Sequence, residues 1–87
     1  MFQIVFSKAA EKHKKLLKAA SLEQKTRALL NILMENPFQN PPPYEKLVGE
    51  LKGAFSRRIN YQHRLVYQVD QSQGTVHILS MWTHYDF

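Results

Sequence analysis

Hydrophobic and polar residues alternate with a period of two near both ends of the chain and recur at helical spacing between them. Phe2, Ile4 and Phe6 share one side of a predicted strand that runs from Phe2 to Phe6. Ser7 can cap a helix that follows and runs to about Ala20. The inward positions of this helix recur at helical spacing. They are Ala9, Ala10, His13, Leu16, Leu17 and Ala20.

A second helix is predicted to begin at Ser21, where Gln24 three residues later completes a capping box. Its buried stripe consists of leucines, namely Leu22, Leu29, Leu30 and Leu33. The helix should end near Asn36, because Pro37 disfavours α geometry in the residue before it. Since the two helices meet directly at Ala20-Ser21, we expect them to form an antiparallel hairpin.

A loop is predicted between Phe38 and Tyr44, and it contains the triplet Pro41-Pro42-Pro43. Such a triplet favours an extended polyproline conformation. We interpret it as a stiff spacer that delivers Glu45 to a fixed place.

Three strands are predicted in the second half of the chain, at Ala54–Ile59, Arg64–Val69 and Thr75–Trp82. Turns at 60–62 and 71–74 separate them, and Gly74 can take positive φ in the second turn. The last strand is the most hydrophobic of the three and is expected to be central. The order β-α-α-β-β-β indicates a single α+β domain over residues 1–87, with a helical hairpin on one face of an antiparallel sheet and the last three strands as a meander.

The charge of the chain favours an anionic partner. Twelve Lys and Arg against seven Asp and Glu give a net charge of +5. Nucleic acid is the first candidate, although many small proteins are this basic without binding it. The chain has no cysteine and no apolar run near the ~18 residues of a membrane span. Its first charges follow the apolar start, the reverse of a secretory signal, so we expect a cytoplasmic protein.

Three polar residues stand out, although none is specific by itself. His84 lies beyond the last predicted strand and can change protonation near neutral pH. Arg64 opens an apolar strand, and Glu45 follows the three prolines. Taken singly, each is more often a surface charge or an edge ion pair. The four histidines lack the spacing of a metal motif, so no metal and no other cofactor is expected.

Arginines alternate with aromatic residues in the same half of the chain. Basic side chains hold phosphates and aromatic rings stack on exposed bases, so this pattern is typical of RNA binding. The residues concerned are Arg57, Arg58 and Arg64 with Tyr61, Tyr67, Trp82 and Tyr85. We expect Tyr67 to belong to the core and Tyr85 to be exposed.

Three blocks of sequence carry a family resemblance. Leu51–Ile59 reads LKGAFSRRI, His63–Tyr67 reads HRLVY, and His84-Tyr85 reads HY. At this spacing the chain resembles the Txe/YoeB family of toxins from bacterial toxin–antitoxin modules, a branch of the RelE-like ribonucleases. The resemblance implies an endoribonuclease that cleaves messenger RNA in the A site of the small ribosomal subunit. It also implies a cognate antitoxin as partner and a possible homodimer, and no membrane.

The resemblance further implies roles for individual residues. The general base falls on Glu45, the arginine that stabilises the transition state on Arg64 and the general acid on His84. Tyr85 corresponds to the tyrosine that packs on RNA, and Arg58 to a second arginine facing the substrate. The neighbouring Arg57 of the basic pair is also expected to bind substrate.

The chain departs from the family pattern at two places. Val48 stands where family members often carry a lysine, and Lys46 or Lys52 is expected to supply the missing phosphate contact. The chain also continues beyond His84-Tyr85 with Asp86 and Phe87, where close relatives stop. Asp86 adds negative charge near the expected acid.

Phosphodiester chemistry gives these roles a metal-free mechanism. The RNA 2′-hydroxyl is the internal nucleophile, Glu45 takes its proton, Arg64 stabilises the charged phosphorane and His84 protonates the leaving 5′-oxygen. Three other interpretations stay open. The chain could be a non-catalytic RNA- or ribosome-binding inhibitor, a toxin-derived co-repressor that acts with its antitoxin, or a plain interaction domain.

Overall fold

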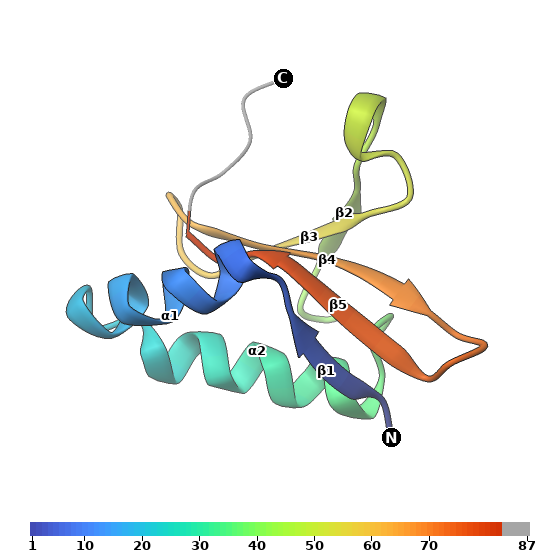
Figure 1. The fold of residues 1–87 in the computed structure, drawn as a ribbon, viewed down its shortest axis with the longest axis horizontal. Helices are drawn as coiled ribbons and strands as arrows, with labels where there is room; N and C mark the ends of the chain where they lie inside the picture. The colour runs from blue at the N-terminus through green and yellow to red at the C-terminus, as the bar shows by residue number, and fades with distance from the viewer. Residues whose placement is uncertain (83–87) are drawn as a thin grey trace.

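The computed structural model describes residues 1–82 of the chain and has an α+β architecture of two helices and one sheet (Figure 1). In chain order the elements are β1 (Gln3–Phe6), α1 (Lys8–Ala19), α2 (Glu23–Glu35), β2 (Tyr44–Lys46), the 3-10 helix η1 (Gly49–Leu51), β3 (Phe55–Arg58), β4 (Arg64–Asp70) and β5 (Thr75–Ser80). The predicted helices and the four predicted strands are all present. Their ends differ from the prediction by at most two residues.

The sheet has the strand order β1-β5-β4-β3-β2. The predicted meander is confirmed, because β3 pairs with β4 and β4 with β5, both antiparallel. The sheet as a whole is mixed, however, since β1 pairs with β5 in parallel. A parallel pair needs a long crossover, and the helical hairpin between β1 and the later strands provides one. β5 lies between β1 and β4, so it is interior, but β4 is the middle strand.

A short strand, β2, begins at Tyr44, the last residue of the predicted loop, where no strand was predicted. It pairs antiparallel with β3, with Tyr44 opposite Arg57 and Glu45 opposite Ser56. The β2–β3 hairpin and η1 lie at the edge of the sheet opposite β1, away from the helices (Figure 1). The extended polyproline prediction was wrong: residues 41 and 42 form a bend, and the peptide bonds before Pro41 and Pro42 are cis.

The start of the first helix follows the prediction. The Ser7 hydroxyl accepts a hydrogen bond from the Ala10 backbone N–H at 3.0 Å and donates one to the Leu79 carbonyl at 2.9 Å. One side chain therefore caps α1 and joins it to β5.

The capping box predicted at Ser21 was wrong. Ser21 has φ +60°, and its backbone N–H donates a hydrogen bond to the Lys18 carbonyl. The backbone N–H of Leu22 donates to the Leu17 carbonyl. This is the Schellman arrangement that satisfies the last carbonyls of a helix. Ser21 therefore ends α1, and α2 begins at Glu23 without a side-chain cap.

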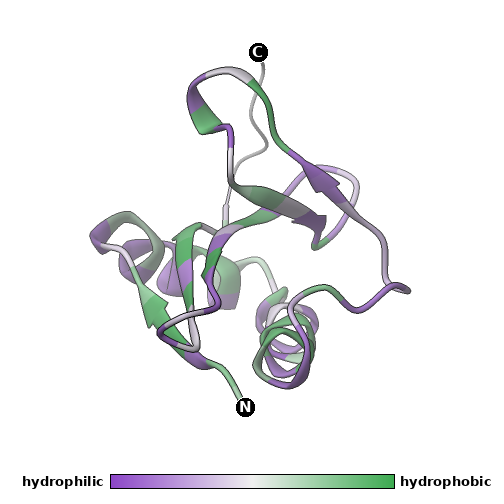
Figure 2. Ribbon diagram, turned by 90° about the vertical axis from the view of Figure 1, so that its right-hand side faces the viewer, coloured by the Kyte–Doolittle hydropathy of each residue, from purple (hydrophilic) through white to green (hydrophobic). Residues whose placement is uncertain are grey.

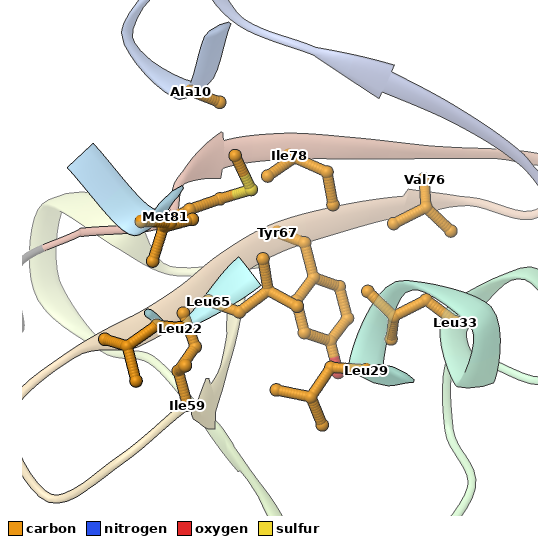
Figure 3. Packing of buried hydrophobic residues seen from close by; sticks show 11 residues of the cluster. Ala10, Leu22, Leu29, Leu33, Ile59, Leu65, Tyr67, Val76, Ile78 and Met81 are labelled. Carbon is orange, nitrogen blue, oxygen red and sulfur yellow. The ribbon is translucent and has the colours of Figure 1, made fainter. Parts of the chain in front are cut away.

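The core lies between the helices and the sheet. Buried residues of α1, α2, β4 and β5, and of the segments next to them, form one cluster (Figure 3). It contains Ala10, Leu17, Leu22, Leu29, Leu33, Ile59, Leu65, Tyr67, Val76, Ile78 and Met81. Hydrophobic and hydrophilic residues alternate around each helix, as expected of helices that bury one stripe (Figure 2). Tyr67 is fully buried, which confirms its predicted place in the core.

Candidate active site

A depression of about 310 Å³ lies on the sheet where β2, β3 and β4 run side by side. Its lining comes from those strands and from the residue before β2. The lining residues are Pro43, Tyr44, Glu45, Ser56, Arg58 and Arg64. Glu45 and Arg64 are two of the three predicted catalytic residues, and Arg58 is a predicted substrate contact. The structure therefore places three candidate residues around one depression.

Strand register explains why these side chains meet. Side chains two residues apart in a strand share a face, so Ser56 and Arg58 of β3 project together. Glu45 is directly opposite Ser56, and Arg64 is directly opposite Arg58. Side chains that are opposite each other in antiparallel strands start from Cβ atoms about 5 Å apart. A carboxylate and two guanidinium groups therefore emerge on one face and line the same depression.

The charge arrangement of this face is unusual for a structural surface. Arg58 and Arg64 are a like-charged cross-strand pair, which destabilises a sheet. Within residues 1–82, the side chains of Glu45 and Arg58 form neither a hydrogen bond nor an ion pair. Within this part of the chain the Arg58 guanidinium thus keeps its donors available for a ligand. Two adjacent cations suit a phosphodiester, whose oxygens accept bidentate hydrogen bonds from arginine.

Arg64 is held in place by the turn that precedes it. Its Nη1 donates to the Asn60 carbonyl at 3.0 Å and, more weakly, to that of Tyr61 at 3.4 Å. The Asn60 side chain builds this turn, because its Oδ1 accepts from the backbone N–H groups of Gln62 at 2.9 Å and His63 at 2.7 Å. Asn60 thereby sets the orientation of the half-buried Arg64 toward the depression.

The prediction that Arg57 binds substrate was wrong. Arg57 is 1% exposed and lies on the opposite face of β3 from Arg58. Its guanidinium donates to the Tyr67 hydroxyl and to three loop carbonyls, those of Pro37, Gln39 and Pro42. All of its charge-assisted hydrogen bonds are internal, so it holds the 37–42 loop beneath β2. The alternation of strand faces already separates it from Arg58, but the family pattern of paired arginines concealed this.

The predicted lysine contacts lie outside the depression. Lys46 is opposite Phe55 and so projects from the other side of β2 than Glu45. Lys52 is exposed just after η1, and Val48 is 70% exposed at the end of the same hairpin. Neither lysine is among the residues that line the depression. Their contact with substrate stays a prediction.

Two of the predicted residues, His84 and Tyr85, lie outside the residues that the structure describes, as does the Asp86-Phe87 extension. The chain can be followed as far as Trp82. The Trp82 carbonyl accepts a hydrogen bond from Nδ1 of His63, and the two rings stack with centroids 4.0 Å apart. His63 immediately precedes Arg64 in the sequence, so the last described residue, Trp82, is attached next to the start of β4. Sequence reasoning gave His63 little weight, and only its place next to Arg64 could have drawn attention to it.

The structure of residues 1–82 also bears on metal binding and on membranes. No group of three or more His, Asp or Glu side chains in this part of the chain could hold a metal ion. Neither helix described has the length and apolar character that crossing a membrane would require.

Comparison with known proteins identifies the family. Residues 7–85 match the family model described as a YoeB-like toxin of bacterial type II toxin–antitoxin systems. The chain belongs to this family. A YoeB toxin of Synechocystis sp. is 38% identical over 72 residues, which are 83% of this chain and 74% of the relative. A YoeB toxin of Mycobacterium bovis is 40% identical over 48 residues, 55% of this chain and 56% of the relative, so the match spans about half of that protein.

Solved structures share the fold of this YoeB-like chain along its length. A YoeB/ParE toxin from Agrobacterium tumefaciens superimposes with a TM-score of 0.87 at 26% identity, covering 97% of this chain and all of the other. The toxin in a heterotetrameric YoeB–YefM toxin–antitoxin complex from Staphylococcus aureus gives a TM-score of 0.81 at 34% identity, covering 98% and 99% of the two chains. These matches confirm the predicted RelE-like α+β fold.

Proposed function

We propose that this YoeB-like toxin is a ribosome-dependent endoribonuclease that cleaves messenger RNA in the A site without a metal ion. The observation that carries the proposal is the convergence of Glu45, Arg58 and Arg64 on one depression of the sheet. A general base and two phosphate-binding cations are the groups that internal attack by a 2′-hydroxyl requires.

The proposed reaction uses the groups in sequence. The Glu45 carboxylate removes the proton from the 2′-hydroxyl, whose oxygen forms a bond to the adjacent phosphorus. Arg64 and Arg58 stabilise the extra negative charge on the phosphorane oxygens. His84 donates a proton to the 5′-oxygen as its bond to phosphorus breaks. The products are a 2′,3′-cyclic phosphate and a 5′-hydroxyl, so atoms and charge balance without water or metal.

The attachment of Trp82 to His63, the residue before Arg64, supports the role proposed for His84. In the sequence His84 follows Trp82 by two residues, and two residues of fully extended chain span about 7 Å. We infer that His84 can reach the phosphodiester that Arg64 contacts. Tyr85 is the proposed RNA-packing residue, with Lys46 and Lys52 as further phosphate contacts on the neighbouring hairpin.

The proposed partners follow from the family. A relative from Staphylococcus aureus has been solved in a heterotetrameric complex with its antitoxin YefM and also as a dimer. We infer that this chain likewise binds a cognate antitoxin and can form a homodimer. Since its substrate is ribosome-bound message, the place of action is the cytoplasm.

The decisive experiment is cleavage of a defined message on programmed ribosomes, followed by primer extension. Discrete cuts with 2′,3′-cyclic phosphate ends support the proposal. A message with a single 2′-deoxy nucleotide at the mapped scissile position should not be cut, because it lacks the nucleophile. Translation arrest with an intact message would instead favour a non-catalytic ribosome-binding inhibitor, and cutting of the deoxy message would rule out the proposed nucleophile.

A further inference from the structure

The first helix carries most of the positive charge of the chain. α1 contains five lysines and one glutamate, so it contributes a net charge of +4, against +5 for the whole chain. α2 packs beside α1 on the same side of the sheet (Figure 1), but it contains two cations and two acids and contributes no net charge. The excess of positive charge therefore belongs to one helix and is not spread evenly over the surface.

Three of these lysines form a stripe along the outer side of α1. Lys8, Lys12 and Lys15 follow one another at intervals of four and three residues, which places them on one side of a helix. The buried residues of α1, Ala10 and Leu17, lie about half a turn away around the helix axis, toward the core. All three lysines are exposed, and none of them forms an ion pair in the part of the chain that the structure describes.

This arrangement of charge does not stabilise the helix. Like charges four residues apart, such as those of Lys8 and Lys12, destabilise a helix. Lys8 also puts a positive charge in the first turn, where the helix dipole favours a negative one. Lys14, in contrast, has structural contacts, because its Nζ lies 2.8 Å from the Glu11 carboxylate and 3.9 Å from the centroid of the Phe6 ring. The Lys8–Lys12–Lys15 stripe thus carries an electrostatic cost that an external anion would offset.

The stripe and the depression lie on opposite sides of the sheet. Leu65 and Tyr67 of β4 point into the core that the helices cover. Arg64 and Val66 alternate with them, so Arg64 projects from the other face of the sheet. The toxin therefore presents cations on two sides, with the arginines on the uncovered face of the sheet and the stripe on the outer surface of α1.

We propose that the Lys8–Lys12–Lys15 stripe is a second RNA-docking surface, which binds the phosphate backbone of ribosomal RNA while the depression holds the message. This inference rests on the proposed function, in which the toxin acts inside the ribosome and has RNA on more than one side.

The chemistry of the stripe favours a nucleic acid backbone over an acidic protein. Lysine ammonium groups bind phosphates as point charges on flexible stems and need no fixed geometry. Lys8 and Lys12 are about 6 Å apart along the helix axis, a spacing at which two phosphates of one strand can be contacted together. Lysine is depleted in protein–protein interfaces, whereas it is a standard contact of nucleic acid phosphates. Such contacts position the toxin and carry no sequence information.

The test removes two charges of the stripe in the variant Lys12→Gln/Lys15→Gln. Lys8 stays in place, because its replacement would also change the electrostatics of the first helical turn. Binding to ribosomes without message is titrated at several salt concentrations, which isolates the contacts with ribosomal RNA from those with the message. We expect the slope of log K against log salt to fall by about two, one for each lost phosphate contact.

The matched control is Lys25→Gln/Arg27→Gln, which removes two exposed charges from α2 and should leave the slope unchanged. Thermal unfolding of both variants checks that they fold. If the glutamine pair does not fold, Lys12→Ala/Lys15→Ala replaces it, since alanine has the highest helix propensity.

Cleavage separates docking from catalysis. The stripe does not line the depression, so at saturating toxin concentration the stripe variant should cut the message on programmed ribosomes at the normal rate. The toxin concentration that gives half of this rate should rise about 2- to 30-fold at low salt, the effect of losing two exposed ion pairs. A lower rate at saturation would assign the two lysines to the chemical step and overturn the inference.

The other outcomes are equally distinct. An unchanged salt slope in the stripe variant overturns the inference, and so does an equal fall in the control, which would assign the effect to net charge. Unchanged ribosome binding with lost binding to poly-L-glutamate would mean that the stripe receives an acidic protein instead. In all these cases the proposed function stands, since the unaltered toxin still binds and cuts. Failure of the unaltered toxin to bind ribosomes would defeat the proposed function, and this inference with it.

Discussion

The guanidinium of Arg57 donates from Nε to the hydroxyl of Tyr67 over 2.9 Å, in the interior of the protein. The Tyr67 hydroxyl in turn donates to the Pro37 carbonyl at 3.2 Å. Burial raises the pKa of Tyr67 although the neighbouring Arg57 charge opposes the shift, so the phenol stays neutral and acts as a donor. This network connects β3, β4 and the loop before β2, and it supports the strand that carries Glu45.

Replacing Arg57 with methionine should therefore reduce stability. The change removes the hydrogen bonds to Tyr67 and to three loop carbonyls. Buried carbonyls that lose a charged donor are costly, and we expect the free energy of unfolding to fall by about 2–4 kcal/mol. Urea denaturation monitored by Trp82 fluorescence measures this change in the free energy of unfolding. Arg58→Met is the matched control: Arg58 is exposed, so its replacement should change stability by less than about 0.5 kcal/mol. Equal losses in the two variants would contradict the buried role of Arg57.

Glu45→Gln should abolish most cleavage while leaving the fold intact. The exposed carboxylate has no hydrogen bond within residues 1–82 that its loss would break. A general base typically contributes about 10²–10⁴-fold, and the amide cannot take up a proton from the 2′-hydroxyl. Single-turnover cleavage on programmed ribosomes measures the cleavage rate of the variant relative to that of the unaltered toxin. Glu50→Gln, the same change at an exposed residue of η1, should keep the normal rate. A Glu45→Gln toxin that cuts normally would assign the base to another group.

Arg64 and Arg58 are expected to differ in how they act, although they are opposite each other in the sheet. Arg64 is oriented by the Asn60 carbonyl, and Arg64→Lys keeps the charge but loses the fork of donors. Cleavage should fall by about 10²–10³-fold with little change in binding.

Arg58→Gln should instead weaken ribosome binding. It should also reduce the slope of log K against log salt by about one, because one phosphate contact is lost. Titrations at several salt concentrations test this, and an unchanged slope would remove Arg58 from the RNA contact.

Local patterns were sufficient to predict most of the fold. Alternation along β4 and β5 places most of their core residues correctly, because burial of apolar side chains dominates that choice. Helical spacing along α1 gives Ala10 and Leu17 as core residues. Ala9, Leu16 and Ala20 were also expected to face inward, but they are exposed. The failures occur where long-range contacts decide. Ser21 ends one helix rather than starting the next, since the last carbonyls of α1 are satisfied there. β2 forms by pairing with β3. The properties of its three residues, Tyr44, Glu45 and Lys46, do not reveal that pairing.

The site was predictable only in part for the same reason. The resemblance indicated Glu45 and Arg64, and strand pairing then explains why they meet. The separation of Arg57 from Arg58 follows from the period of two in β3, although the arginine pair was interpreted as a unit. His63 contacts Trp82, 19 residues away, and no local pattern could indicate that contact.

Stability should fall in mild acid because of His13. Burial lowers the pKa of this histidine below its ordinary value of 6.5, and its neutral Nδ1 accepts the hydrogen bond from Met81. Between the lowered value and 6.5, the unfolded chain binds more protons at this residue than the folded protein does. The free energy of unfolding therefore increases with pH across that window. The contribution of neutral His13 is complete above pH 6.5 and is lost as the pH falls toward the lowered pKa.

The asparagine variant His13→Asn isolates this effect. Asparagine can accept from the Met81 N–H through its side-chain oxygen but does not titrate, so its own cost in the helix is independent of pH. The difference in unfolding free energy between the unaltered protein and the variant should be constant above pH 7. Below pH 6.5 it should change in favour of the variant, with a slope of at most about 1.4 kcal/mol per pH unit. Denaturation at pH 5 to 8 provides both curves. Parallel curves throughout would mean that His13 has the same proton affinity in the folded and unfolded chains.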